Sequence, residues 1–262
     1  MKCYRIGDIV RQVKTEISDG CNEVWLTSTD NGCYGLDIEA DLPELVNAVS
    51  EIDKQFFIRV GMINPMYMPK IRDDLLKSFE SSKVFKFLHV PVQSGSNKVL
   101  NDMKRGHTQQ TFRDITNKFR RKFEKFTIST DVIVGFPTET EEDFEQTLRL
   151  LEETKPDIVN LSRYSQRPGT SAAEMKQINV TEVKRRSKIA YELINRISEE
   201  NNRNWIGWEG QVIFDEEHQD QIKGRNFAYK PIFVKEKPKI GLILTVNIID
   251  TTTHSLIGEI IS

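Results

Sequence analysis

Small and polar side chains follow five apolar, β-branched segments in the first two thirds of the chain. These polar followers are residues 27–30 (TSTD), 61–65 (GMINP), 91–96 (PVQSGS), 134–139 (VGFPTE) and 162–165 (SRYS). In a parallel β/α fold the carboxyl ends of the strands meet at one edge, and the ligand site lies there. The sequence therefore predicts a wide site with a polar rim, assembled from several strand ends, rather than the single-nucleophile site of a hydrolase.

Some of these polar residues have a structural alternative. Residues 140–143 (TEED) have the pattern of a capping box with acidic residues in the first helical turn, so we expect their carboxylates to cap a helix rather than act as an acid/base pair. Ser96 is expected to cap the helix that follows it. Gln93 and Ser94 lie on the turn before that helix, where turn hydrogen bonds and ligand hydrogen bonds are both open to them.

The cysteines and histidines show no pattern of metal ligands. Cys3, Cys21 and Cys33 contain no CxxC pair, and the four histidines are scattered. We therefore expect neither a disulfide framework nor a closed zinc site, and we assign no metal ligand. The spacing alone identifies no catalytic residue.

Alternating strands and helices must position the polar side chains. Strands are predicted at residues 23–28, 56–61, 86–91, 127–134 and 157–161. Helices are predicted at residues 6–19, 42–52, 109–124 and about 181–203. The aromatic residues of the basic segment 119–126 recur at helical spacing, which favours a core stripe over an RNA-stacking surface. The alternation is typical of an α/β fold with parallel strands.

The tail of the chain has a different texture. Short strands are predicted at residues 210–214, 221–227, 229–235, 241–249 and 256–261, which suggests a small β-barrel of OB-like size after a boundary near 204–209. Residues 221–239 carry a formal charge of +5, with Phe227, Tyr229 and Phe233 among the cations. Such a surface suits a nucleic-acid backbone with bases stacked on the rings. The alternative is an ordinary strand edge protected by lysine.

Length and composition limit the class of protein. The 262 residues are 38% hydrophobic and 29% charged, with a formal net charge of −2. This is enough chain for one large α/β domain with a small appendage. No apolar run is long enough to span a membrane, so we expect a cytoplasmic protein that does not contact a membrane.

Several motifs at the strand ends are more specific and occur in one order. They are EVWLTS (23–28), DNGCYG (30–35), RVGMINP (59–65), HVPVQSG (89–95), MKR (103–105), STDVIVGFPTET (129–140) and RYSQRPGT (163–170). This set resembles the radical S-adenosylmethionine tRNA methylthiotransferases, and in particular the archaeal and eukaryotic branch that modifies threonylcarbamoyladenosine beside the anticodon. The tail is similar to the TRAM domain of these proteins through Gly224-Arg225, YKP (229–231) and LIG (256–258).

The resemblance implies an α/β fold, namely a radical SAM (β/α)6 partial barrel over residues 1–204, followed by an OB-like, all-β TRAM barrel over residues 205–262. It implies S-adenosylmethionine and [4Fe-4S] clusters as cofactors and the anticodon stem-loop of tRNA as partner. The implied reaction is the 2-methylthiolation of N6-threonylcarbamoyladenosine.

Site residues follow from the resemblance by position. Thr27, Ser28 and Thr29 are expected to hold the methionyl amine of S-adenosylmethionine, although Thr29 departs from the carboxylate or amide usual at its position. Gln93 and Ser94 are expected to contact its ribose or carboxylate, and the strand that ends at Val134 and Gly135 is expected to pack against its adenine. Further residues implied for the cofactor are Asn64 and Asp131, and those implied for substrate or RNA are Arg163, Arg167, Lys223, Arg225, Phe227, Tyr229 and Lys230.

The front of the sequence departs from the family pattern. Family members carry CxxxCxxC on the first barrel strand, and its thiolates ligate the radical-generating cluster. Residues 3–6 match the loop that follows that motif. We therefore expect a C-terminal part of a methylthiotransferase that lacks the first strand and cannot generate the radical alone, with the N-terminal portion as a candidate partner chain. The alternatives are a non-catalytic tRNA-binding remnant and an unrelated barrel enzyme.

Overall fold

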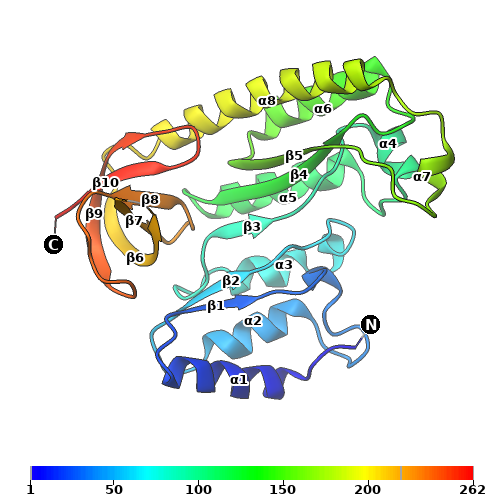
Figure 1. Cartoon of the computed structure of the whole chain (residues 1–262). Coiled ribbons are helices and arrows are strands. Elements are labelled where there is room, and N and C mark those ends of the chain that lie inside the picture. The colour runs from blue at the N-terminus through cyan, green and yellow to red at the C-terminus, as the bar shows by residue number, and fades with distance from the viewer. Residues whose placement is uncertain (1, 219, 262) are drawn as a thin grey trace.

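The computed structural model describes residues 2–218 and 220–261. Five parallel strands with covering helices occupy most of the chain, and a small β-barrel follows them (Figure 1). The strands are β1 (Glu23–Leu26), β2 (Phe57–Val60), β3 (Phe87–His89), β4 (Thr127–Val134) and β5 (Ile158–Arg163). β1 pairs with β2, and β3, β4 and β5 form a second sheet in that order. All five strands lie where the sequence predicts strands.

Helices connect the strands and cover the sheets. They are α1 (Ile6–Ser18), the 3₁₀ helix η1 (Asn31–Cys33), α2 (Leu42–Ser50), α3 (Met68–Ser78), α4 (Asn97–Asp102), α5 (Gln109–Lys122), α6 (Glu141–Thr154), α7 (Ser171–Glu174) and α8 (Val180–Arg203). The Ser96 hydroxyl accepts a hydrogen bond from the backbone N–H of Val99, and Thr140 forms a capping box with Asp143. Both predicted caps are confirmed, so the TEED carboxylates belong to a helix start.

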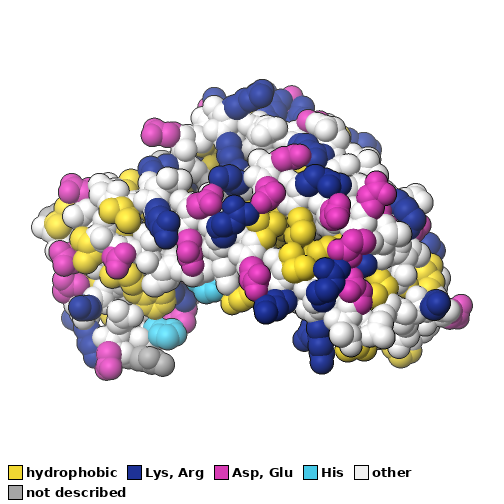
Figure 2. Space-filling model, turned by 90° about the horizontal axis from the view of Figure 1, so that it is seen from above, with side chains coloured by type: hydrophobic (Ala, Val, Ile, Leu, Met, Phe, Trp, Pro, Cys, Tyr) yellow, Lys and Arg dark blue, Asp and Glu magenta, His cyan; other side chains and the backbone are white. Residues whose placement is uncertain are grey.

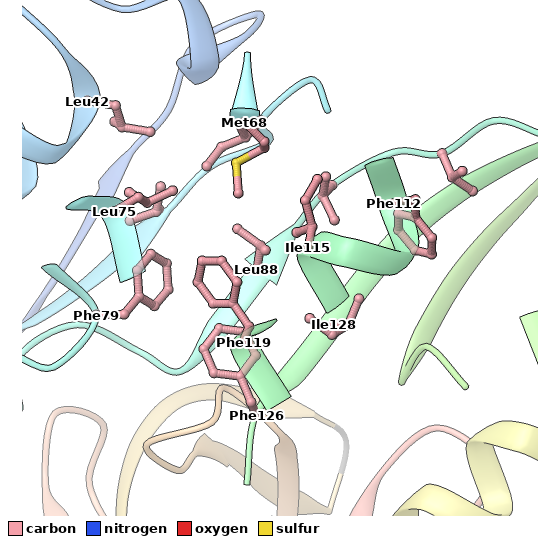
Figure 3. Close-up of a cluster of buried hydrophobic side chains, with 14 of the residues drawn as sticks. Leu42, Met68, Leu75, Phe79, Leu88, Phe112, Ile115, Phe119, Phe126 and Ile128 are labelled. Atoms are coloured by element: carbon pink, nitrogen blue, oxygen red, sulfur yellow. The ribbon is translucent and has the colours of Figure 1, made fainter. Parts of the chain in front are cut away.

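The main hydrophobic core lies between the strands and α3, α5, α6 and α8. Phe79, Phe119 and Phe126 are buried there, with ring centroids 5.2 to 5.7 Å apart (Figure 3). Phe112 and Ile115 extend the same face of α5. The prediction that this aromatic stripe is core is therefore confirmed.

The tail forms a closed barrel with its own core. Its strands are β6 (Glu209–His218), β7 (Gln221–Arg225), β8 (Pro231–Val234), β9 (Ile243–Thr251) and β10 (Leu256–Ile260), in the order β10-β8-β7-β6-β9. β8 and β10 are parallel, and the other pairs are antiparallel. Phe214, Ile232 and Val246 are fully buried inside it. The expected β-barrel of five short strands is present.

The barrel packs against the amino ends of the parallel strands. The Lys86 backbone N–H, directly before β3, donates to the Phe227 carbonyl at 2.7 Å. The Tyr229 ring contacts Phe85 and Phe87 with centroids 4.8 and 5.2 Å away. The opposite, carboxyl ends of the strands are left free for a ligand site (Figure 1).

Candidate functional site

A cavity of about 860 Å³ lies at the carboxyl ends of β4 and β5. Its lining comes from the turn after β3, the end of α4, the two strand ends and the segment 162–172. The volume falls within the range of small-molecule and cofactor sites, and the position is the one expected for a parallel β/α fold. The predicted polar-rimmed site is thus present at the ends of β3, β4 and β5, whereas the segments after β1 and β2 lie outside its lining.

Gln93 lies in this cavity on a constrained backbone. Its φ angle is 69°, in the left-handed region that few residues other than glycine adopt. Its backbone N–H donates to the Asp131 carbonyl at 2.8 Å, and its own carbonyl accepts from the Ile133 N–H at 2.9 Å. These bonds extend the parallel pairing with β4 by one residue and hold the Gln93 side chain against the cavity. Strain of this kind is common at functional sites.

Three side chains from adjacent strands form a polar cluster beside the cavity. Asp131 Oδ1 lies 3.1 Å from His89 Nε2 and accepts a hydrogen bond from Asn160 Nδ2 at 2.7 Å. Burial alone would raise the pKa of Asp131, but the hydrogen bonds from His89 and Asn160 outweigh it and lower the pKa below its ordinary value. Asp131 is therefore held as a carboxylate at the cavity wall.

Sequence reasoning missed His89 and Asn160. His89 was treated as one of several scattered histidines. The signal lies in the strand pairing: Asn160 is opposite Asp131, and His89 is opposite Ser129, which lies two residues before Asp131 and so on the same face.

A second polar network connects the ends of β1 and β2. Ser28 Oγ donates to Asn31 Oδ1 at 2.9 Å, and the Asn64 backbone N–H donates to Asp30 Oδ1 at 3.1 Å. Thr27, Ser28 and Thr29 are solvent-exposed at this edge. The structure thus places the predicted residues 27–29 and Asn64 together, outside the lining of the large cavity.

Ser94, Val134 and Gly135 do not line the cavity. Ser94 is fully buried, and its hydroxyl accepts from the Ser96 N–H and contacts Thr147 Oγ1, so its role is in the turn. Val134 is fully buried in the core. A Cβ on Gly135 would lie 2.7 Å from a Val183 methyl group, so this glycine allows α8 to approach. Asp131, Val132 and Ile133 are the residues of this strand that line the cavity.

Arg163 and Arg167 both line the cavity, as do Lys104 and Arg105 at the end of α4. The resemblance implies a substrate contact for Arg163 and Arg167, whereas Lys104 and Arg105, which belong to the motif MKR, have no role implied for them. Asp102 and Asp131 are the acidic residues of the lining. Cationic side chains therefore surround much of the rim.

The tail residues occupy different environments from those expected. Tyr229 and Lys230 are only 6% and 3% exposed, because both lie in the contact between the barrel and the core. Lys230 Nζ donates to Asp157 Oδ1 at 2.9 Å and to Asn202 Oδ1 at 3.1 Å. The expectation that these two side chains form an exposed binding face is therefore corrected.

The other three tail residues remain accessible to some extent. Lys223 pairs with Glu216, and Arg225 with Asp215 at 3.2 Å and with the Tyr229 ring at 4.5 Å. Phe227 is 37% exposed. The fully exposed cations of the tail are instead Lys235, Lys237 and Lys239, in the loop between β8 and β9. These lysines lie in a loop, away from the strands and turns that carry Phe227, Tyr229 and Phe233.

The donor set does not fit an iron–sulfur cluster. The sequence has no CxxxCxxC spacing, and the Cys33 thiol donates to the Asp30 carbonyl within its own turn. Within residues 2–218 and 220–261, no group of three or more Cys, His, Asp or Glu side chains is placed to hold a metal ion. The described helices also include none with the length and apolar character required to cross a bilayer.

Comparison with known proteins places this geometry in a family. Residues 4–151 match the model of the radical SAM superfamily. A probable threonylcarbamoyladenosine tRNA methylthiotransferase of Archaeoglobus fulgidus is 41% identical over 99% of this chain and 61% of its own length. The Drosophila melanogaster threonylcarbamoyladenosine tRNA methylthiotransferase is 36% identical over 98% of this chain and 47% of its own length.

The solved structures agree on the fold. Coproporphyrinogen III oxidase of Escherichia coli, described as a radical SAM enzyme, superposes with a TM-score of 0.55 over 98% of this chain and 65% of its own, at 14% identity. This chain spans about half to three fifths of the length of the curated relatives named above. With its parallel strands and its cavity at their carboxyl ends, the chain belongs to the radical SAM superfamily.

Proposed function

We propose that this chain carries part of the S-adenosylmethionine site and the RNA-binding barrel of a tRNA methylthiotransferase that acts on N6-threonylcarbamoyladenosine beside the anticodon. One observation carries the proposal: the cavity is lined by the HVPVQSG, STDVIV and RYSQRPGT segments, in a chain whose archaeal and animal relatives bear that name. We assign residues 1–204 to a (β/α)6 partial barrel without its first strand and residues 205–262 to a TRAM domain.

The residues present suit S-adenosylmethionine. Exposed hydroxyl groups at residues 27–29, with Asn64 beside them, would receive the charged methionyl end. Gln93 and Asp131 present an amide and a carboxylate to the cavity, and Ile133 offers an apolar side chain to the adenine. S-adenosylmethionine supplies a methyl group and, after reductive cleavage, a deoxyadenosyl radical. The protein's own contribution is to orient it and the target base at one edge of the sheet.

The 262 residues do not include the CxxxCxxC ligands of the cluster that starts this chemistry. We propose that these ligands belong to a segment outside the 262 residues, on the same polypeptide or on a separate N-terminal chain. After anaerobic incubation of this chain with iron, sulfide and a reductant, we expect no deoxyadenosine from S-adenosylmethionine. Substantial deoxyadenosine in that assay would show that the ligand assignment is wrong.

The second candidate function is a non-catalytic tRNA-binding protein, favoured by the missing cluster ligands. Equilibrium dialysis with labelled S-adenosylmethionine separates the two. The methylthiotransferase proposal expects saturable binding that weakens in Gln93→Ala, whereas a pure RNA binder would retain no S-adenosylmethionine. Lys188→Gln on the surface of α8, where the lysine side chain is 79% exposed, is the matched control and should bind as the original chain does.

A further inference from the structure

The cations of the cavity rim form no ion pairs with the residues that the structure describes. Arg105, Arg163, Arg167 and Lys104 line the cavity, and none of them forms an ion pair with another residue of 2–218 or 220–261. Arg105 comes close enough to lower the pKa of Asp131 through its charge. Several unneutralised cations at one cavity mouth create a positive potential that favours an anion.

Several arginines elsewhere on the core pair with neighbouring carboxylates, although Arg121 forms no ion pair among the described residues. Arg113 pairs with Glu153, and Arg196 with Glu152, each at 2.7 Å, and Arg185 pairs with Glu141 at 2.6 Å. Figure 2 shows the resulting mixture of Lys, Arg, Asp and Glu side chains over the face of α6 and α8. The cavity rim differs from these paired arginines because four cations without an ion pair among the described residues line one cavity.

The acidic residues of the lining do not serve as the missing partners. Asp102 Oδ2 accepts from Thr138 Oγ1 at 2.5 Å and pairs with Lys98 at 3.3 Å. Asp131 is occupied by His89 and Asn160. Both carboxylates are therefore satisfied within the fold, and the arginines remain available to a ligand.

Backbone hydrogen bonds hold the main chain at these cationic residues in place. The Arg105 N–H donates to the Leu100 carbonyl and the Lys104 N–H to the Asn101 carbonyl, each at 2.9 Å, and Lys104 has a φ of 56°. This closed turn ends α4. Arg163 is the last residue of β5 and pairs in register with Val134. The two sides of the rim are thus held by separate rigid elements.

We propose that Arg105 and Arg163, with Lys104 and Arg167 beside them, form a subsite for an oxyanion of the RNA substrate. The inference rests on the proposed function. The oxyanion is either the carboxylate of the threonylcarbamoyl group or a phosphate next to the target nucleoside, since a guanidinium binds both in a bidentate manner. The methionyl amine of S-adenosylmethionine is assigned to the other network, at residues 27–29, which does not line this cavity.

The test compares two anticodon stem-loop RNAs, one with N6-threonylcarbamoyladenosine and one with plain adenosine, by fluorescence anisotropy at fixed salt. The variants are Arg163→Gln, Arg105→Gln and the charge-conserving Arg163→Lys. The matched control is Arg121→Gln, because Arg121 is an exposed arginine of α5 that does not line the cavity. Thermal unfolding of each variant verifies that the fold persists.

A carboxylate subsite predicts about tenfold weaker binding of the modified RNA by the two glutamine variants, an intermediate loss in Arg163→Lys and no change for plain RNA. A phosphate subsite predicts an equal loss for both RNAs. If Arg105→Gln and Arg163→Gln bind both RNAs as tightly as the control Arg121→Gln does, the subsite proposal is wrong.

A nucleoside arm separates this inference from the proposed function. Isothermal titration measures binding of N6-threonylcarbamoyladenosine and of its methyl ester, which lacks the carboxylate charge. If the chain binds neither stem-loop, the proposed function fails. In that case the subsite is supported if the original chain binds the free acid more tightly than the ester and the Arg105 and Arg163 variants lose this preference. Equal binding of acid and ester by the original chain would show that the subsite proposal is wrong.

Discussion

Gly135 shows how one residue sets the packing around the site. Its φ of 80° lies in the left-handed region, and its N–H donates to Glu139 Oε1 at 3.0 Å. A Cβ there would collide with Val183 of α8 at 2.7 Å. The resemblance to known enzymes suggested a cofactor contact for this glycine, whereas the structure gives it a helix-packing role.

Gly135→Ala should therefore destabilise the fold through both backbone strain and overpacking, by roughly 2–4 kcal/mol in urea unfolding. Gly207→Ala is the control, because Gly207 has a nearly identical φ of 81° but nothing within 4 Å of the added Cβ. It should lose only the backbone contribution, about 1–2 kcal/mol. Equal losses for the two variants would show that contact with Val183 does not matter.

Asp131 makes the stability depend on pH in a defined direction. Its pKa is lower in the folded chain than its ordinary value, so the carboxylate stabilises the fold above that ordinary value, and the stabilisation is lost as the pH falls through the folded pKa. Asp131→Asn should cost about 1–2 kcal/mol at pH 6, and the cost should shrink below about pH 4. The free energy of unfolding of the original chain and of Asp131→Asn, determined across this pH range, tests this prediction. A difference between them that does not change with pH would contradict the lowered pKa of Asp131.

At the scale of elements, the contact between barrel and core depends on a buried charge. Lys230, at the start of β8, reaches Asp157 before β5 and Asn202 on α8. The side chains of Lys230 and Asp157 are 3% and 9% exposed. A buried pair of this kind holds its elements in register, and removal of one partner is costly because the other charge stays buried.

Lys230→Met should lower the free energy of unfolding by roughly 3 kcal/mol, because it leaves Asp157 buried with a weaker partner, Arg120 at 3.4 Å. Lys235→Met removes an exposed lysine from the same barrel and should change stability by less than about 0.5 kcal/mol. Chemical denaturation followed by tryptophan fluorescence compares the two. Similar stability of both variants would mean that the Lys230 contact is not important.

The elements were predictable where their signal is local. Apolar, β-branched runs predict all five parallel strands, and the Thr140 and Ser96 caps mark the helix starts. The burial of Lys230 was not predictable, because its partner Asp157 lies 73 residues away in sequence. Gln93 and Ser94 are adjacent polar residues of one turn, and the sequence does not distinguish their roles. In the structure Gln93, with a φ of 69°, lines the cavity, whereas the Ser94 hydroxyl accepts a hydrogen bond within the turn.

In the whole molecule, the barrel lies at the amino ends of the parallel strands (Figure 1), whereas the cavity lies at the carboxyl ends of β4 and β5. A long RNA that enters the cavity with one nucleoside must therefore reach the barrel along the outside of the core. The exposed cations of the barrel that could meet its backbone are Lys235, Lys237 and Lys239, rather than the buried Lys230.

Neutralisation of these three lysines to glutamine should weaken tRNA binding and reduce the slope of log affinity against log salt by roughly 2–3. The single variant Lys223→Gln should change the slope less, because Lys223 already pairs with Glu216. Titrations at several salt concentrations provide the slope. An unchanged slope in the triple variant would assign RNA binding to another surface.

We propose that this chain holds the substrate and S-adenosylmethionine for methylthiolation, while the cluster ligands come from another segment. The most direct measurement is mass spectrometry of a stem-loop bearing N6-threonylcarbamoyladenosine after anaerobic incubation with S-adenosylmethionine, iron, sulfide and reductant. The incubation contains this chain alone, a CxxxCxxC-bearing amino-terminal segment of a relative alone, or both. We expect a 2-methylthio product only when this chain and the amino-terminal segment are both present. Formation of the product by this chain alone would contradict the proposal. It would also be contradicted if the two together cleave S-adenosylmethionine but form no 2-methylthio product.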